Sequence, residues 1–146
     1  MPDATLFLEL VALFAVALAF GGAAGFSFVL APTLLKRLPR AAAGEALRAL
    51  FPVYYLAIAG TALAGMAVLS ALAPTRNLDV ALLAAVALVN IVQRRLLLPR
   101  MEDARARVPA QPMQDPGFRR LHAISVTLNL AAIALLLATL LRLGGP

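Results

Sequence analysis

The chain has 146 residues, of which 62% are hydrophobic and 14% are charged, and its formal net charge is +6. The core of a water-soluble domain does not need so much apolar surface, so the composition excludes an ordinary soluble protein and indicates an integral membrane protein. Cysteine is absent, which excludes disulfides and thiolate sites, and a single histidine leaves little material for a metal centre, so we expect no bound metal.

Four long apolar segments follow one another along the chain, and each can form a transmembrane helix, which needs about 20 residues. The sequence predicts spans at about residues 6–31, 52–73, 78–98 and 118–141. These segments are continuous runs rich in Ala and Leu, whereas the strands of membrane barrels alternate apolar and polar residues. We therefore predict an all-α fold, a single integral membrane domain built as a four-helix bundle.

A short amphipathic segment, residues 40–51, lies between the first and second spans. Its apolar side chains fall on one side and Glu45 and Arg48 on the other, so we predict a short separate helix at the membrane interface. Pro52 then stands in the first turn of the second span, where its missing backbone N–H is harmless.

The third span is interrupted by two arginines, Arg94 and Arg95. It crosses the membrane only if both side chains extend toward the headgroups. We interpret them, together with Arg119 and Arg120 at the start of the fourth span, as the cytoplasmic mouth of the bundle. The alternative role for the first pair is to clamp an anionic ligand there.

The basic residues are distributed unevenly. Four lie in the connection between spans 1 and 2 and seven in or beside that between spans 3 and 4, against only Arg76 and Arg142 at the other end. The positive-inside rule therefore predicts cytoplasmic connections and both termini outside. Twelve Arg against one Lys suggest a GC-rich bacterial genome and hence the bacterial inner membrane. Anionic lipid headgroups are the expected partner, and we expect no nucleic-acid binding.

Small residues spaced four apart mark the faces on which membrane helices approach closely. The first span carries Gly21 and Gly25 in such a row, and the second carries Gly60 and Gly65 in two others. We predict that these glycines pack the helices of the bundle against one another. A homodimer interface is the alternative.

Polar side chains inside the membrane are costly and therefore informative. Six of them, on the second, third and fourth spans, are spaced so that they face the bundle interior: Tyr54, Asn90, Gln93, His122, Ser125 and Asn129. On the fourth span they run from His122 near the cytoplasmic headgroups to Asn129 close to the middle of the bilayer. We predict that they form a polar pocket open to the cytoplasm. The alternative is that they are only hydrogen-bonded clamps between helices.

Several short motifs also carry a family resemblance. They are Gly25-Phe26-Ser27-Phe28 with Ala31-Pro32, Phe51-Pro52-Val53-Tyr54-Tyr55, Asn90 with Pro99, and Phe118-Arg119-Arg120-Leu121-His122 with Ser125 and Asn129. With them the chain resembles the small four-span family of unassigned function that includes the human transmembrane protein 205. The resemblance implies an inner-membrane four-helix bundle with a shared polar site. A more distant similarity to copper-resistance and haem-handling four-span proteins makes haem the only cofactor to consider, and otherwise we expect none.

Three functions are compatible with this pattern. The first is a non-enzymatic protein that binds or moves a small, partly lipophilic ligand through the polar pocket. The second is an oxidoreductase, oxygenase-like or haem-associated protein that acts on a membrane-dissolved substrate, with His122 as general acid or base. The third is a structural or assembly partner that uses the small-residue faces. We expect the first.

Overall fold

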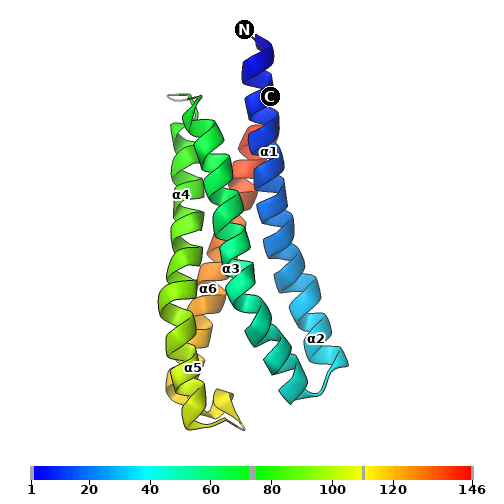
Figure 1. The fold of residues 1–146 in the computed structure, drawn as a ribbon, viewed down its shortest axis with the longest axis vertical. Coiled ribbons are helices and arrows are strands. Elements are labelled where there is room, and N and C mark those ends of the chain that lie inside the picture. Colours follow the sequence, from blue (N-terminus) through cyan, green and yellow to red (C-terminus); the bar gives the residue numbers. More distant parts are fainter. Residues whose placement is uncertain (1, 73–74, 110, 146) are drawn as a thin grey trace.

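The computed structural model describes residues 2–72, 75–109 and 111–145, and within them four long helices form an elongated bundle (Figure 1). Four stretches in this part of the chain are long and apolar enough to cross a membrane: Ala4–Arg37, Arg40–Ser70, Asn77–Arg107 and Pro116–Gly144. The prediction of an all-α, four-helix membrane protein is therefore confirmed. Residue 73, where we predicted that the second span ends, lies outside the described residues.

The helices are divided by short irregular segments. In chain order the elements are α1 (Pro2–Ala24), the π-helix η1 (Gly25–Leu30), α2 (Ala31–Arg37), α3 (Arg40–Ser70), α4 (Asn77–Val92), the π-helix η2 (Gln93–Leu97), α5 (Leu98–Arg107), the 3-10 turn η3 (Pro112–Gln114) and α6 (Pro116–Gly144). Helix α3 packs on α1 and α4, and α6 closes the ring by packing on the same two helices.

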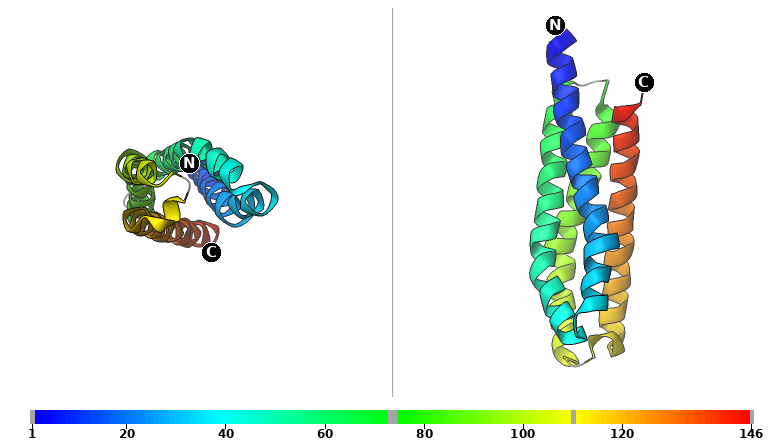
Figure 2. Two further views of the ribbon diagram at one scale, coloured as in Figure 1. Left: turned by 90° about the horizontal axis from the view of Figure 1, so that it is seen from below. Right: turned by 90° about the vertical axis from the view of Figure 1, so that its right-hand side faces the viewer.

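The two ends of the bundle differ. Both termini and the α3–α4 turn lie at one end, here called the terminal end, and the α2–α3 and α5–α6 connections lie at the other (Figure 2). We call the second the basic end, because eleven of the 13 Lys and Arg residues lie in or beside those two connections.

The predicted separate interfacial helix is wrong. Residues 40–51 are helical, but they form the first turns of α3, which continues through Pro52 to Ser70. The chain breaks earlier, at Leu38, whose extended backbone is the conformation favoured before a proline such as Pro39. Pro52 removes only one N–H from α3, and an interior proline is tolerated in membrane helices when neighbouring groups pack around it.

Both π-helical segments precede a proline by two residues. Segment η1 ends at Leu30, before Pro32, and η2 ends at Leu97, before Pro99. A proline has no N–H for the carbonyl one turn back, and its ring crowds that carbonyl, so the preceding turn widens to relieve the clash. Each widened turn shifts the helical register by a residue, and such turns frequently occur at functional sites.

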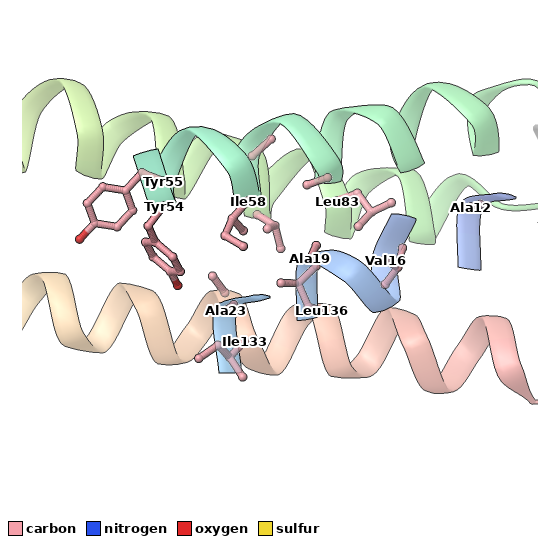
Figure 3. Close-up of a cluster of buried hydrophobic side chains, with 14 of the residues drawn as sticks. Ala12, Val16, Ala19, Ala23, Tyr54, Tyr55, Ile58, Leu83, Ile133 and Leu136 are labelled. Carbon is pink, nitrogen blue, oxygen red and sulfur yellow. The ribbon is translucent and has the colours of Figure 1, made fainter. Parts of the chain in front are cut away.

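The hydrophobic core is built on one face of α1. Its members on that helix, Ala12, Val16, Ala19 and Ala23, are all buried and pack with side chains of α3, α4 and α6 such as Ile58, Leu83 and Leu136 (Figure 3). The alanines let the helices approach closely, which is the main source of attraction between helices in lipid.

The glycines that we predicted as packing residues occupy different positions. A Cβ on Gly65 would meet Leu83 Cδ1 at 3.3 Å, so this glycine lies at a close contact between α3 and α4. A Cβ on Gly21, Gly25 or Gly60 would meet nothing within 4 Å. The close helix contact of α1 is therefore made by the alanine face, while its glycine row faces the outer surface of the bundle.

Helix α6 begins after a capping residue, Asp115. Its Oδ1 accepts a hydrogen bond of 2.7 Å from the backbone N–H of Phe118, and its Oδ2 lies 3.2 Å from Arg107 Nε. The Phe118 N–H and the Arg107 guanidinium hold the pKa of Asp115 below its ordinary value of 3.8.

This cap predicts an acid-sensitive connection. Because the folded pKa lies below the unfolded one, the carboxylate stabilises the fold above pH 3.8, and this contribution is lost as the pH falls through the lower folded pKa. We expect hydrogen exchange in the α5–α6 connection, corrected for its intrinsic pH dependence, to increase in that acidic range. Asp115→Asn still caps but does not ionise, so it should flatten the profile. A profile that Asp115→Asn leaves unchanged would contradict this account.

Candidate functional site

A layer of polar side chains crosses the bundle beside the hydrophobic core, where Tyr54 and Tyr55 form one end of the buried cluster (Figure 3). The Tyr54 hydroxyl donates a hydrogen bond to Asn129 Oδ1. Asn129 Nδ2 in turn donates to Ser27 Oγ at 2.8 Å. This first chain of hydrogen bonds joins α3, α6 and η1.

A second chain starts at the neighbouring tyrosine. Ser125 Oγ donates to Gln93 Oε1 at 2.7 Å, and the Tyr55 hydroxyl lies 3.0 Å from Ser125 Oγ. Since the serine proton is used toward Gln93, Tyr55 is the donor to Ser125. This chain joins α3, α6 and η2. All four membrane helices therefore contribute to one polar layer, and each π-helix supplies one residue, Ser27 or Gln93.

Aromatic packing holds the two tyrosines in place. The Tyr54 ring stacks on Phe26 with centroids 4.3 Å apart, and the Tyr55 ring stacks on Phe51 at 5.7 Å. The two tyrosine rings meet edge to face at 5.2 Å. Such contacts bury the rings and fix their orientation, so each hydroxyl points toward its hydrogen-bond partner in the polar layer. The apolar cluster thus positions the polar groups.

Two amide groups in the layer remain open. Asn90 Nδ2 donates to the Val86 carbonyl at 2.9 Å, but Asn90 Oδ1 has no partner among the described residues, and neither has Gln93 Nε2. Both side chains are buried, with exposed fractions of 1% and 0%. An unpaired buried polar group costs about 1–3 kcal/mol, so one acceptor and one donor, three residues apart along the same helix, are available to a polar molecule.

The structure brings most of the predicted polar residues together. Tyr54, Gln93, Ser125 and Asn129 lie in the two hydrogen-bond chains, and Asn90 lies on the helix that carries Gln93. Sequence reasoning missed Tyr55 and Ser27 as members of the layer. Both belong to the sequence motifs that carry the family resemblance, and these motifs could have identified them as members of the layer.

His122 lies apart from the two chains. Its ring stacks on Phe118, with centroids 6.0 Å apart and planes 5° from parallel. The guanidinium carbon of Arg105 lies 5.5 Å from the centre of the same Phe118 ring. Among the described residues no hydrogen bond joins His122 to Ser125 or Asn129. The histidine therefore belongs to a stack of rings on the side of the layer toward the basic end.

The arginines of the predicted mouth differ in their surroundings. Arg94 Nε donates to the Pro52 carbonyl at 3.1 Å, and this bond ties η2 to α3. Arg95, Arg119 and Arg120 are exposed. Of these four, Arg94 is the one whose side chain forms a hydrogen bond with another described residue of the bundle.

A charged cluster at the terminal end was not predicted. Arg142 Nε donates to Asp79 Oδ1 at 2.6 Å, and Arg76 lies 2.6 Å from Glu9 Oε1 and 3.8 Å from Asp79 Oδ2. Asp79 is completely buried. The four side chains join α1, α4, α6 and the α3–α4 turn. The sequence does place two basic residues and a few carboxylates at that end. Which of them pair with one another depends on the tertiary arrangement, so the ion pairs could not be predicted.

No three potential metal ligands of the His, Cys, Asp or Glu type lie together in the described ranges of the chain. The expectation of no bound metal is not tested by this arrangement, and neither is haem, the one cofactor that the family resemblance brought into consideration. The donors that the layer does offer are hydroxyls and amides. These groups suit hydrogen bonding to a small organic molecule better than coordination of a soft metal.

Comparison with known proteins adds a family. A family model described as a domain of unknown function, DUF4149, matches residues 14–109, which is more than half of the chain. The match contains Ser27, both tyrosines and both open amides of the polar layer, while Ser125 and Asn129 follow it. No curated protein and no solved structure shows significant similarity. The chain therefore belongs to the DUF4149 family of domains of unknown function.

Proposed function

We propose that this protein binds or moves a small, partly lipophilic molecule at the polar layer, without catalysing a reaction. The observation that carries the proposal is the pair of unpaired buried amide groups, Asn90 Oδ1 and Gln93 Nε2. A purely structural set of clamps gains most when every member is paired, and a half-satisfied polar network is less stable than an apolar core. The cost of leaving these two groups open is offset if a ligand pairs them.

The open groups indicate the chemistry of the ligand. Asn90 Oδ1 accepts a hydrogen bond and Gln93 Nε2 donates one, so a group that both donates and accepts, such as a hydroxyl, amide or phenol, fits them. The hydrogen-bond chain that contains Gln93 is built of hydroxyls held by stacked aromatic rings, which suit a ligand whose remainder is apolar. A charged ligand is a poor fit, because no ionised side chain takes part in the two hydrogen-bond chains.

The orientation in the membrane is part of the same proposal. The eleven basic residues support a cytoplasmic basic end and outside termini, and the composition supports the bacterial inner membrane. On this reading the ligand reaches the layer from the cytoplasmic side. The sequence motifs likewise support kinship with the family that includes the human transmembrane protein 205.

Replacing Asn90 by leucine tests the proposal. The change removes the unpaired oxygen, so we expect the purified, ligand-free protein to gain about 1 kcal/mol of stability while it loses ligand binding. Thermal unfolding in mild detergent, with and without a panel of amphipathic alcohols, amides, phenols and quinones, measures both effects.

Thr139→Val is the matched control, because Thr139 is buried and, within the described part of the chain, its hydroxyl bonds just to the carbonyl of Leu135 in its own helix. It should leave any ligand-induced rise in melting temperature unchanged. If Asn90→Leu and the wild type respond equally to every compound that stabilises the wild type, the amides do not bind the ligand and the proposal fails.

A second candidate, self-association, has its own observation. Gly21, Gly22 and Gly25 line an open apolar groove of about 380 Å³ between the first helix and α3. A small-residue face open to the surroundings is typical of helices that pack against another chain. By contrast, the oxidoreductase and haem-associated functions have less support, because His122 takes no part in the polar chains.

A further inference from the structure

A second groove lies on the bundle surface between α3 and the helix formed by α4 and η2. Its volume is about 240 Å³, and it is lined by Tyr55, Leu56, Ala59, Ile91, Arg94 and Arg95. Because α3 and α4 run in opposite directions, Tyr55 and the two arginines lie toward the basic end, and Ala59 and Ile91 lie deeper. The groove, here called the arginine groove, therefore has an apolar inner part and a cationic end.

The two arginines differ from the paired ones. Arg48, Arg76, Arg107 and Arg142 each form an ion pair, but no carboxylate in residues 4–72, 75–109 or 111–145 pairs with Arg94 or Arg95. The bond from Arg94 Nε to the Pro52 carbonyl uses one of the five N–H donors of that guanidinium. Its terminal nitrogens are therefore held at the groove with their donors available.

The position of the arginines along the helix places them near the edge of a bilayer that begins at the start of α4. Arg94 follows the first residue of α4, Asn77, by 17 positions, which corresponds to about 25 Å along the helix. The hydrocarbon core of a bilayer is about 30 Å thick. Unpaired arginines near its edge are stabilised when they reach the phosphate groups of lipids. An anionic group at this level is therefore stabilised by the two guanidinium charges.

We infer that the arginine groove binds one anionic glycerophospholipid. The phosphodiester lies between the guanidinium groups of Arg94 and Arg95, whose planar donors match phosphate oxygens, and one acyl chain lies along Leu56, Ala59 and Ile91. The apolar inner part distinguishes this ligand from a free phosphate ion, which has nothing to place there. The site goes beyond the proposed small-molecule function, since neither Asn90 nor Gln93 lines the groove.

The absence of tryptophan from the chain allows a specific fluorescence test. Ile91→Trp places a single fluorophore in the groove wall, and Leu56→Trp does so from the opposite wall in case the first substitution fills the space. Leu88→Trp is the matched control, because Leu88 is one turn away on α4, 62% exposed and outside the groove. Each variant is reconstituted in phosphatidylcholine vesicles in which brominated phosphatidylglycerol or brominated phosphatidylcholine is the quencher.

We expect the groove probes to prefer phosphatidylglycerol over phosphatidylcholine by about five- to twenty-five-fold in relative binding constant, since each of the two arginines near a headgroup contributes about fivefold. The Leu88→Trp control should show only the weak preference of the surrounding lipid. Adding Arg94→Gln and Arg95→Gln to a groove probe should reduce its preference to the control value. Adding Arg94→Lys and Arg95→Lys should preserve much of it, because the charges remain.

Two further experiments test whether Arg94 and Arg95 bind a lipid specifically. Arg119→Gln with Arg120→Gln removes the same charge from the same end and should leave the preference of the groove probes unchanged. If it lowers the preference as much as the Arg94 and Arg95 changes do, or if control and groove probes agree, attraction is diffuse and the inference is overturned. If inorganic phosphate abolishes quenching by phosphatidylglycerol, the ligand is a free anion and the lipid assignment is wrong.

Discussion

Replacing Arg142 by methionine is expected to lower the free energy of unfolding by about 3 kcal/mol, more than the removal of the carboxylate that it contacts. Asp79 is completely buried, whereas the Arg142 side chain is 44% exposed. Without Arg142, the one cation that remains near the buried carboxylate among the described side chains is Arg76, whose NH1 lies 3.8 Å from Oδ2. A buried charge without a close partner is strongly destabilising.

The reverse change should cost less. Asp79→Asn keeps the shape of the side chain, and it leaves Arg142 free to turn toward water and Arg76 bound to Glu9. We expect a loss of about 1 kcal/mol. In the double variant Asp79→Asn with Arg142→Met, the buried charge is absent, so this protein should be more stable than Arg142→Met alone.

Reversible unfolding of the protein in mixed micelles, followed by circular dichroism, measures this cycle. Arg107→Met serves as the control, because Arg107 is 61% exposed and its pair with Asp115 is a surface contact, which contributes little. The explanation is wrong if Arg142→Met and Asp79→Asn cost the same, or if their effects simply add.

Replacing Gly65 by leucine is expected to destabilise the bundle by about 3 kcal/mol. Even a Cβ at this position would lie 3.3 Å from Leu83 Cδ1 and 3.6 Å from Val16 Cγ2, and both neighbours are fully buried. Three more carbon atoms have no space unless α3 moves away from α1 and α4. Closely packed interiors resist such a change.

The same substitution at Gly60 provides the comparison. A Cβ there meets nothing within 4 Å, so Gly60→Leu should change the monomer by less than about 1 kcal/mol, with the better helix propensity of leucine acting in its favour. Equal losses at Gly60 and Gly65 would contradict the packing described here.

Replacing Gly21 by leucine, also at an open position, tests self-association. If the protein is a dimer through the groove beside α1, its mass in detergent falls to that of a monomer while its helices stay folded.

The amino-acid sequence predicts the four helices because each is a continuous apolar run, a property that depends on neither register nor partner. It does not predict which side of a helix faces inward when two sides are equally apolar. In the first membrane helix the alanine face with Ala19 and Ala23 is buried, whereas a Cβ at Gly21 on α1 or at Gly25 on η1 would meet nothing within 4 Å, although both rows consist of small residues. The choice is made by the shapes of the facing helices.

The polar layer shows the same limit. The prediction placed residues at 100° intervals, but the π-helices before Pro32 and Pro99 change the register locally. Ser27 lies inside one of these segments, which is why it was missed. The spacing on α6 does place Ser125 and Asn129 on one face, and both reach the layer. His122 shares that spacing, yet the Phe118 ring beside it supplies an aromatic partner instead.

The charged cluster at the terminal end has an electrical consequence. Glu9 and Asp79 balance Arg76 and Arg142, so these four side chains together carry no net charge. In the proposed orientation this is the end that must be transferred across the bilayer during biosynthesis, and ion pairing lets the guanidinium groups be transferred with their charge compensated. The excess positive charge sits at the basic end, where the membrane potential, negative inside, opposes its export. We therefore propose, as part of the same orientation, that the potential itself helps to fix the direction in which the bundle is inserted.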